Sequence, residues 1–327
     1  MKFLLTAINA KFIHSNPAIY SLRAGVGEKL QPYVELAEFT INESLESILE
    51  GIWKRQPKVI GFSCYIWNWK LIREILTELP KILPDTEIWL GGPEVTYDGP
   101  GLLREFPQVT GIMVGEGEVT FREVLDHYVR ETETAGQSEQ QPEPDRIEQQ
   151  AADRTGTVAG KSVAERFGQI SGLCLASGYT APRELTDLTT LPFLYEDMEP
   201  FTNRIIYYET SRGCPYRCSY CLSSIDKKVR LRDIDVVKRE LQFFLDQNVK
   251  QVKFIDRTFN CDHKHAMEIW RYIYEHDNGV TNFHFEISAD ILREEEIALL
   301  NRFRPGLAQL EIGVQSTNPE TIRAIHR

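Results

Sequence analysis

The sequence predicts an α/β protein with two parallel sheets in succession, a doubly wound, Rossmann-like sheet and then a partial (β/α) barrel. Residues 1–130 and residues 204–327 each alternate short apolar segments with amphipathic helical patterns, which is typical of strand–helix units. Residues 131–203 differ in composition and lose this alternation. We therefore expect two folded domains joined by an insertion and a connecting segment.

The first domain shows five apolar segments separated by helical patterns. Val59–Tyr65 is a nearly continuous apolar run, as expected of a central parallel strand covered on both faces. In the pattern at 44–54, Ile48 and Ile52 share one helical face. The expected strands are 1–9, 34–39, 59–65, 87–93 and 111–118, and the expected helices are 16–30, 44–54, 69–83 and 120–131.

The segment between the domains has three parts. Residues 131–166 are rich in Glu, Gln, Ala and Gly and nearly free of aromatic side chains, so we expect a mobile insertion that cannot offset its chain entropy by burial. Residues 168–180 predict a short strand or hairpin. In 187–200, Pro192 and Pro200 favour an extended connection.

The second domain shows four strand–helix units, which suggest a barrel-like parallel sheet. Three acidic residues from Glu294 onward open one of its helices, where they suit the helix dipole. The expected strands are 205–211, 252–259, 283–289 and 307–316, and the expected helices are 234–247, 265–275, 294–303 and 319–327.

Composition excludes several classes of protein. The net charge of −11, from 37 basic and 48 acidic residues, repels phosphate backbones, so a nucleic-acid partner is not expected. No stretch approaches the ~20 apolar residues of a membrane helix, so no membrane partner is expected either. Six cysteines with three clustered fit a reducing compartment, and we expect the cytoplasm.

Three of the cysteines, Cys214, Cys218 and Cys221, lie in one loop after an expected strand. Thiolates at this spacing can wrap a cubane [4Fe–4S] cluster and leave one iron without a protein ligand. An open coordination position is where a metal site does chemistry. A structural zinc site is the alternative, but it prefers two paired ligand clusters, and no second Cys-x-x-Cys is present. A disulfide between two of these cysteines is a further alternative.

The other cysteines, Cys64, Cys174 and Cys261, are scattered singly along the chain. Each is most simply a small buried hydrophobic residue. Cys261 follows an expected strand end, where it could approach the site.

The cysteine spacing, with Tyr220 directly before the last thiol, resembles the signature of radical S-adenosylmethionine (SAM) enzymes. The resemblance implies that SAM chelates the open iron and that the reduced cluster cleaves it to a 5′-deoxyadenosyl radical. It also implies an external electron donor of the flavodoxin or ferredoxin type, and it places Tyr220 against the adenine. A complete core of this type has six strand–helix units, whereas four are visible here, so we expect a truncated chain.

Three loops of the first domain resemble the cobalamin-binding domain that precedes the core in one class of radical SAM enzymes. Ser63 follows the third expected strand, Gly91 and Gly92 the fourth, and Gly115 the fifth. Ligands of open parallel sheets bind at these carboxyl ends. The resemblance implies that the nucleotide tail of cobalamin lies against Gly91 and Gly92, beside Ser63.

This domain departs from the family pattern in one respect. The Asp-x-His-x-x-Gly motif that supplies a histidine to cobalt is absent, and His14 lies after the first strand without it. The alternative to a cobalamin site is a first domain that keeps the fold but no longer binds any cofactor.

Candidates for SAM contacts follow the later strands. Asp256 and Arg257 stand where the family has a Gly-Gly-Glu segment, although Arg257 could clamp a substrate carboxylate or pair with Asp256. Alternation in 283–288 puts Glu286 on the polar face of its strand. By resemblance, Gln315 and Ser316, together with Glu311, lie where family members bind the ribose and carboxylate of SAM.

These observations favour a cobalamin-dependent radical SAM enzyme that abstracts hydrogen from a small-molecule substrate, followed by methyl transfer or rearrangement. A methylthiotransferase is an alternative, but that family needs three further cysteines in the first domain, where only Cys64 lies. A cobalamin- or cluster-binding sensor without turnover is the third possibility.

Overall fold

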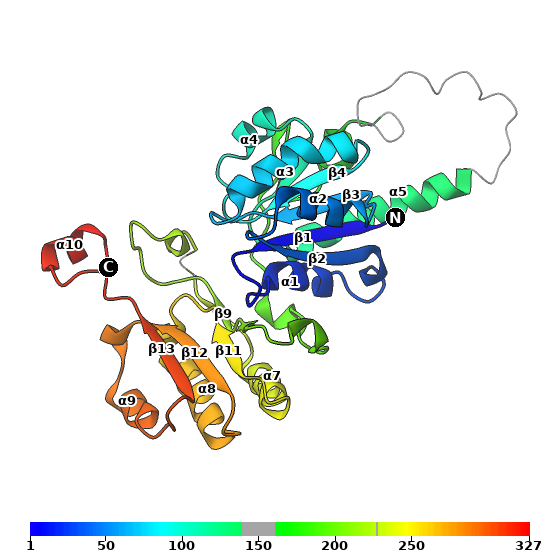
Figure 1. Ribbon diagram of the computed structural model, residues 1–327. Helices are drawn as coiled ribbons and strands as arrows, with labels where there is room; N and C mark the ends of the chain where they lie inside the picture. The colour runs from blue at the N-terminus through cyan, green and yellow to red at the C-terminus, as the bar shows by residue number, and fades with distance from the viewer. Residues whose placement is uncertain (139–160, 227) are drawn as a thin grey trace, which may run out of the picture. The chain divides into compact units, whose positions relative to one another are not determined.

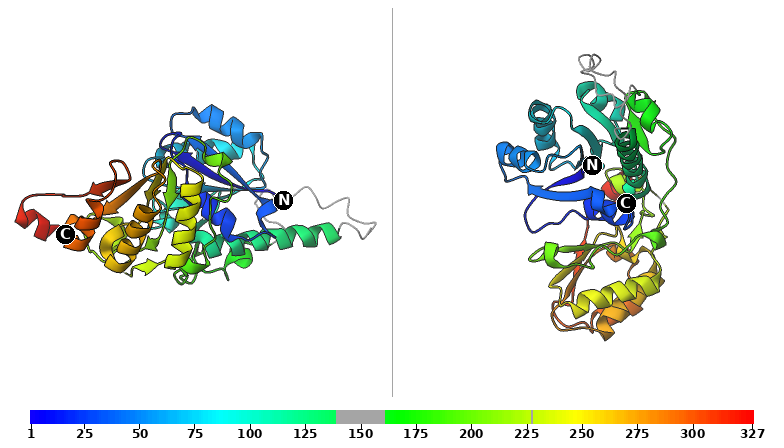
Figure 2. Two further views of the ribbon diagram at one scale, coloured as in Figure 1. Left: turned by 90° about the horizontal axis from the view of Figure 1, so that it is seen from below. Right: turned by 90° about the vertical axis from the view of Figure 1, so that its right-hand side faces the viewer.

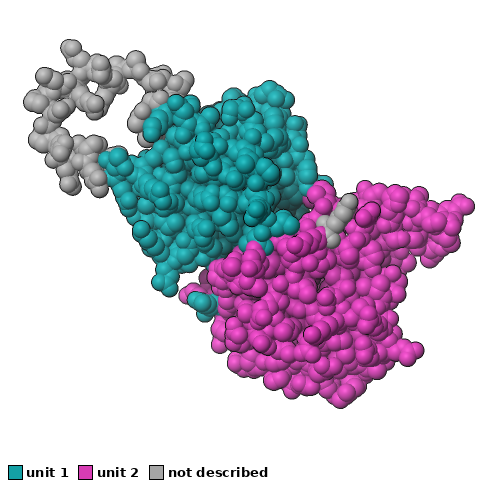
Figure 3. Space-filling view, turned by 180° about the vertical axis from the view of Figure 1, so that it is seen from behind, with its two compact units in different colours: residues 1–186, 194–196 teal, residues 187–193, 197–327 magenta. Residues whose placement is uncertain are grey.

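The computed structural model describes residues 1–138, 161–226 and 228–327, which form two compact units (Figure 3). Unit 1 comprises residues 1–186 with 194–196, and unit 2 comprises residues 187–193 with 197–327. Most of the predicted insertion at 131–166 lies outside the described residues. No described helix has the length and apolar character to cross a membrane.

Unit 1 is built on a seven-stranded sheet with the order β2-β1-β3-β4-β5-β6-β7 (Figure 1). The first five strands are parallel, as predicted, and β6 and β7 add an antiparallel hairpin within the segment 168–180. The strands are β1 (Phe3–Asn9), β2 (Val34–Thr40), β3 (Val59–Ser63), β4 (Glu87–Gly91), β5 (Val109–Met113), β6 (Leu173–Leu175) and β7 (Gly178–Tyr179).

Helices cover both faces of this sheet, which confirms the doubly wound architecture (Figures 1 and 2). One face packs against α2 (Leu45–Trp53), α3 (Trp69–Ile82) and α4 (Gly99–Glu105), and the other packs against α1 (Pro17–Gly25), α5 (Gly117–Ser138) and α6 (Val163–Phe167). Helix α5 runs past the predicted end at residue 131, because the Glu- and Ala-containing start of the insertion suits a helix.

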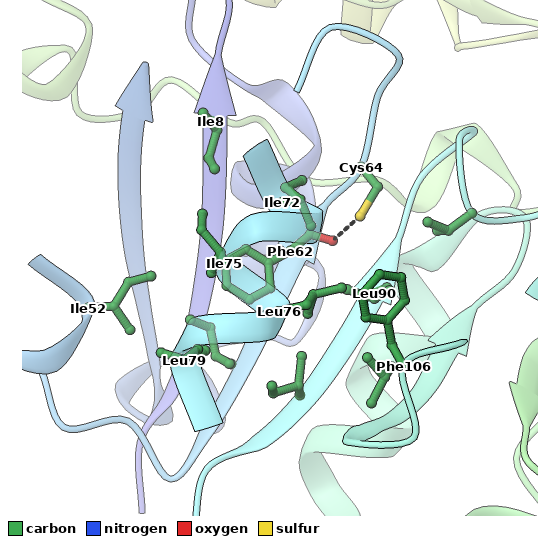
Figure 4. Close-up of a cluster of buried hydrophobic side chains, with 14 of the residues drawn as sticks. Ile8, Ile52, Phe62, Cys64, Ile72, Ile75, Leu76, Leu79, Leu90 and Phe106 are labelled. Carbon is green, nitrogen blue, oxygen red and sulfur yellow. Dashed lines mark hydrogen bonds between the residues drawn. The ribbon is translucent and has the colours of Figure 1, made fainter. Parts of the chain in front are cut away.

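The alternation along β1 explains why two cores form. Leu4 and Ile8 point into one core, and Phe3, Leu5 and Ala7 point into the other. Figure 4 shows the first core, where α3 presents a row of apolar side chains to the strands. That row is Ile72, Ile75, Leu76 and Leu79, all fully buried.

Unit 2 holds a four-stranded parallel sheet in the order β13-β12-β11-β8, with a helix after each strand (Figure 1). The strands are β8 (Ile206–Tyr208), β11 (Gln251–Phe254), β12 (Asn282–Ile287) and β13 (Ala308–Ile312), and the helices are α7 (Ile234–Asp246), α8 (His263–Glu275), α9 (Glu294–Leu300) and α10 (Pro319–Ala324). The predicted strand–helix alternation is confirmed. Phe254, Phe283 and Phe285 form its aromatic core with Trp270.

All four strands of the second sheet are shorter than predicted, and β12 differs least from its predicted range of 283–289. The segment 205–211 stops at Tyr208 and resumes as β9 (Ser211–Arg212), which pairs antiparallel with β10 (Arg230–Leu231). The segment 252–259 stops at Phe254, two residues before the buried Asp256. The segment 307–316 stops at Ile312.

Candidate functional site

The three clustered cysteines lie on a loop that is closed at its base by the β9–β10 pair. Cys214 and Cys218 are buried and Cys221 is half-buried. The Cys214 N–H donates to the carbonyl oxygen of Asp226 at 2.9 Å, and the Cys221 N–H donates to that of Cys218 at 3.1 Å. These backbone hydrogen bonds fold the loop that carries the three cysteines back on itself, after the first strand of the second sheet.

Gly213 fixes the entry to this loop. Its φ of +94° is a conformation that residues with a side chain rarely adopt. A Cβ there would also lie 2.4 Å from the carbonyl oxygen of Lys228, on the returning arm of the loop. Ion pairs from Arg212 to Glu209 at 2.8 Å and from Arg230 to Asp226 at 3.0 Å flank the same base.

Asp256 ties the end of β11 to the start of the cysteine loop. Its carboxylate accepts hydrogen bonds from the Thr210 N–H at 3.2 Å, the Thr210 hydroxyl at 2.7 Å and the Ser211 hydroxyl at 2.5 Å. Burial raises the pKa of Asp256, against the effect of these donors. Arg257, in contrast, is exposed, and the described residues contain no ion pair between it and Asp256.

Two further side chains approach Cys214. The Thr258 hydroxyl oxygen lies 3.5 Å from the Cys214 sulfur and donates to the carbonyl oxygen of Arg257 at 2.9 Å. Burial, followed by the nearby Cys214 and Asp256, raises the pKa of Cys261 to about 11. Cys261 thus lies within electrostatic range of the loop, whereas Cys64 and Cys174 are buried in unit 1.

A charged cluster occupies the polar face of the second sheet. Lys253 Nζ lies 3.3 Å from Glu286 and 3.1 Å from Glu311, and His284 Nε2 lies 3.0 Å from Glu311. Strand register explains this, since β12 and β13 pair Glu286 with Glu311 and β11 pairs Lys253 with His284. Glu286 and Glu311 are among the candidates predicted from the sequence, whereas no sequence pattern predicted that Lys253 joins them.

The electrostatics of this cluster favour a charged lysine and a neutral histidine. Burial opposes the charge of Lys253, but the hydrogen bonds and charges of Glu311 and Glu286 raise its pKa above the usual value. Burial and the Lys253 charge lower the pKa of His284. The Lys253 hydrogen bond lowers the pKa of Glu311. One cation and two carboxylates therefore face the same side of the sheet.

The remaining candidates of unit 2 lie on its surface. Tyr220 is 52% exposed. Gln315 is exposed and has a φ of +64°, and the neighbouring Ser316 hydroxyl accepts a hydrogen bond from the Asn318 N–H at 3.0 Å. The structure does not bring Gln315 or Ser316 into hydrogen bonds with the charged cluster.

The cysteine loop suits an iron–sulfur cluster better than a single metal ion. Among the described residues, no three His, Cys, Asp or Glu side chains converge on one metal position. A cubane cluster does not require such convergence, because each thiolate binds a different iron. Three soft sulfur donors on a closed, largely buried loop fit this kind of cofactor.

The candidate loops of unit 1 interlock at the carboxyl edge of its sheet. The Cys64 N–H donates to the Gly91 carbonyl at 2.7 Å, directly after β3 and β4 end. Gly92 has a φ of +109°, and a Cβ there would lie 2.5 Å from the Cys64 carbonyl oxygen. Gly115 has a φ of +81° and open space around it. The Ser63 hydroxyl accepts a hydrogen bond from Asn16 at 3.1 Å.

Exposed apolar side chains also follow the strands at this edge, and sequence reasoning missed them. They are Phe12 and Ile13 after β1, Ile66 and Trp67 after β3, and Tyr97 after β4, with exposures between 45% and 81%. We call this set the apolar rim. Trp67 stacks on Tyr65 with ring centroids 4.3 Å apart. Apolar residues directly after strand ends were the available signal, since exposed groups of this kind mark binding surfaces.

Two family models match the sequence. The B12 binding domain matches residues 4–125, and the Radical SAM superfamily matches residues 208–327. The chain contains a B12-binding domain followed by a radical SAM domain. The two domain families support the predicted [4Fe–4S] cluster, SAM and cobalamin as its cofactors.

Curated relatives of this chain include an uncharacterized methyltransferase, PH0819, of Pyrococcus horikoshii. It is 26% identical over 229 residues, which are 69% of this chain and 45% of the relative. The cobalamin-dependent radical SAM methyltransferase TokK of Streptomyces tokunonensis is 28% identical over 215 residues, 62% of this chain and 28% of the relative. The chain thus spans less than half the length of these relatives.

A solved structure has the same fold. It is the cobalamin-dependent SAM radical enzyme OxsB with aqua-cobalamin and SAM bound, with a TM-score of 0.71 and 16% identity over 99% of this chain and 45% of that chain. This likeness confirms the fold class, in which a Rossmann-like domain precedes a radical SAM core.

Proposed function

We propose that this protein is a cobalamin-dependent radical SAM enzyme that transfers a methyl group to carbon in a small-molecule substrate. The observation that carries the proposal is the presence of a B12-binding domain and a Cys-x3-Cys-x2-Cys loop on one chain, each at the carboxyl ends of parallel strands. The names of the relatives PH0819 and TokK, both methyltransferases, support the reaction class.

Cys214, Cys218 and Cys221 would hold the cluster, with one iron left for SAM. When bound, the cluster and SAM supply one-electron bond cleavage, and cobalamin supplies methyl transfer. Asp256 would support the loop rather than contact SAM, because Thr210 and Ser211 already donate to its carboxylate. This support fixes the direction in which the loop leaves β8.

The polar face of the second sheet would bind SAM and orient it. Glu286 and Glu311 can accept hydrogen bonds from hydroxyl or ammonium groups, and Lys253 holds the two carboxylates in place. Tyr220, Gln315 and Ser316 are exposed or half-buried beyond this face, where ligand contacts remain available to them. The exposed Arg257 would bind a carboxylate of SAM or of the substrate.

The carboxyl edge of unit 1 would bind cobalamin. Gly91, Gly92 and Gly115 let the backbone approach the cofactor closely, and Ser63 provides a hydroxyl. The apolar rim would cover part of the corrin ring, as large apolar surfaces do in cofactor sites.

The reaction needs an electron from outside the chain, and we propose a small flavodoxin or ferredoxin as the donor. The clustered thiols also suit a reducing compartment, which we propose to be the cytoplasm.

The test is anaerobic reconstitution with iron, sulfide and hydroxocobalamin, followed by reduction in the presence of SAM. We expect about four irons per chain, one cobalamin per chain, and formation of 5′-deoxyadenosine and S-adenosylhomocysteine. Cys218→Ala should lose the cluster and both products, whereas the matched control Cys174→Ala, a buried cysteine of unit 1, should keep them.

Other outcomes would contradict the proposal. Iron well above four per chain would favour a methylthiotransferase, although unit 1 holds only Cys64 and Cys174, both buried. Stoichiometric cobalamin without SAM cleavage would favour a sensor. 5′-Deoxyadenosine without S-adenosylhomocysteine would favour rearrangement over methyl transfer.

A further inference from the structure

Ser63 ends β3 at the carboxyl edge of the first sheet, and its hydroxyl has a partner that the sequence did not suggest. The side-chain amide nitrogen of Asn16 donates to the Ser63 oxygen at 3.1 Å. Asn16 lies 47 positions earlier in the chain and is only 5% exposed. The role that this contact gives Ser63 rests on the proposed cobalamin site.

The orientation of the Asn16 amide is fixed by a second contact. Asn16 is the N-cap of α1, and its side-chain oxygen accepts from the Ile19 N–H at 3.4 Å. An amide has one accepting end and one donating end. Because the oxygen caps the helix, the NH2 group must be the end that faces Ser63.

The backbone of Asn16 is held as well. Its N–H donates to Glu38 Oε1 at 3.0 Å, and the same carboxylate accepts from Asn9 at 2.8 Å and from the Tyr20 hydroxyl at 2.7 Å. Asn9 and Glu38 lie on β1 and β2, and Tyr20 lies on α1. Asn16 is therefore positioned by two strands and a helix before any ligand binds.

This arrangement determines what Ser63 offers to a ligand. Its oxygen accepts from Asn16, and among the described residues the Ser63 hydroxyl proton donates no hydrogen bond, so this proton is available to a ligand. A ligand atom with a lone pair can accept a hydrogen bond from the Ser63 hydroxyl. A ligand group that donates to Ser63 instead would leave the hydroxyl proton without a partner.

We infer that Asn16 is a positioning residue that makes Ser63 a hydrogen-bond donor to an acceptor atom of cobalamin. Suitable acceptors are a ring nitrogen, a phosphate oxygen or an amide carbonyl of the nucleotide side of the cofactor. Asn16 itself need not touch the ligand.

The decisive variant is Asn16→Asp. Asp caps a helix as well as Asn does and has nearly the same shape, but its carboxylate only accepts hydrogen bonds. Ser63 would then donate to that carboxylate and turn its lone pairs toward the ligand. We expect the Kd for hydroxocobalamin, measured by absorption titration of the apoprotein, to rise between about fivefold and a hundredfold.

Three variants separate this effect from helix capping and folding. Asn318→Asp makes the same change at the N-cap of α10 in unit 2 and should leave the Kd unchanged. Asn16→Ser keeps a capping residue without added charge but removes the NH2 group, and it should weaken binding less than Asn16→Asp. In a Ser63→Ala background, Asn16→Asp should have little further effect, because the hydroxyl it acts through is gone.

The outcomes are distinct. An unchanged Kd for Asn16→Asp, or the same loss with and without the Ser63 hydroxyl, overturns the inference. Wild-type protein that takes up no cobalamin overturns the proposed function and the inference with it. Thermal unfolding of each apoprotein shows whether a loss of binding follows from loss of fold.

Discussion

Replacement of Gly92 by alanine tests the interlocked loops of the B12-binding domain. At a φ of +109°, an added Cβ would lie 2.5 Å from the Cys64 carbonyl oxygen and 3.1 Å from its nitrogen. Both are backbone atoms, so no side-chain rotation relieves the overlap. Backbone strain costs about 1–3 kcal/mol, and loss of the 2.7 Å hydrogen bond from Cys64 to Gly91 adds about 1 kcal/mol.

We therefore expect Gly92→Ala to destabilise the apoprotein by about 2–4 kcal/mol, which lowers the Tm of a unit of this size by roughly 4–16 °C. The assay is thermal and urea unfolding followed by circular dichroism. Gly91→Ala is the matched control for stability, because a Cβ there would meet Met113 at an ordinary 3.8 Å. Equal losses for the two variants, or no loss for Gly92→Ala, would refute this reasoning.

Three further predictions concern single side chains. Asp256→Asn places an NH2 group against the donors Thr210 and Ser211, so the iron content after reconstitution should fall. The control variant Asn318→Asp should keep its iron. Full iron loading of Asp256→Asn would contradict the role of Asp256 in supporting the loop. Glu311 and Glu286 raise the pKa of Lys253 in the folded protein above 10.5, its value in the unfolded chain. The charged Lys253 therefore stabilises the fold fully below pH 10.5, and this stabilisation is lost as the pH rises through the higher pKa of the folded state. Lys253→Met should thus lose on the order of 0.5–1 kcal/mol near neutral pH and little at strongly alkaline pH, as unfolding curves at several pH values would report; an equal loss at all pH values would oppose this. Trp67→Ala should weaken cobalamin binding about tenfold with little change in Tm, whereas Trp53→Ala, an equally exposed tryptophan at the end of α2, should not change the Kd.

Much of the fold could be predicted because the periodicity of the sequence is strong. Val59–Tyr65 predicted a central strand, and β3 is indeed paired on both sides and buried. The sequence predicted a short strand or a hairpin in 168–180, and the structure has a hairpin there. Strand ends were harder to place, since hydrophobic pattern does not show where a chain leaves a sheet for side-chain contacts such as those of Asp256.

The candidate sites were predictable only where residues close in sequence act together. The cysteine loop is local, and its spacing, with Tyr220 before the last thiol, carries the resemblance that predicts a cluster. The contacts of Asn16 with Ser63 and of Lys253 with Glu311 join residues 47 and 58 positions apart, and only strand order and register bring them together. Whether Asp256 faces a ligand or the protein likewise depends on its burial, which the sequence does not reveal.

Electron paramagnetic resonance of the reduced, reconstituted protein, before and after addition of SAM, reports most directly whether the cysteine loop holds a cluster with an open iron. Three thiolates with one open iron predict a [4Fe–4S]⁺ spectrum whose g values shift when SAM binds, and no such signal in Cys218→Ala. A spectrum that SAM leaves unchanged, or an intact cluster signal in Cys218→Ala, would show that these three cysteines do not hold a cluster that binds SAM.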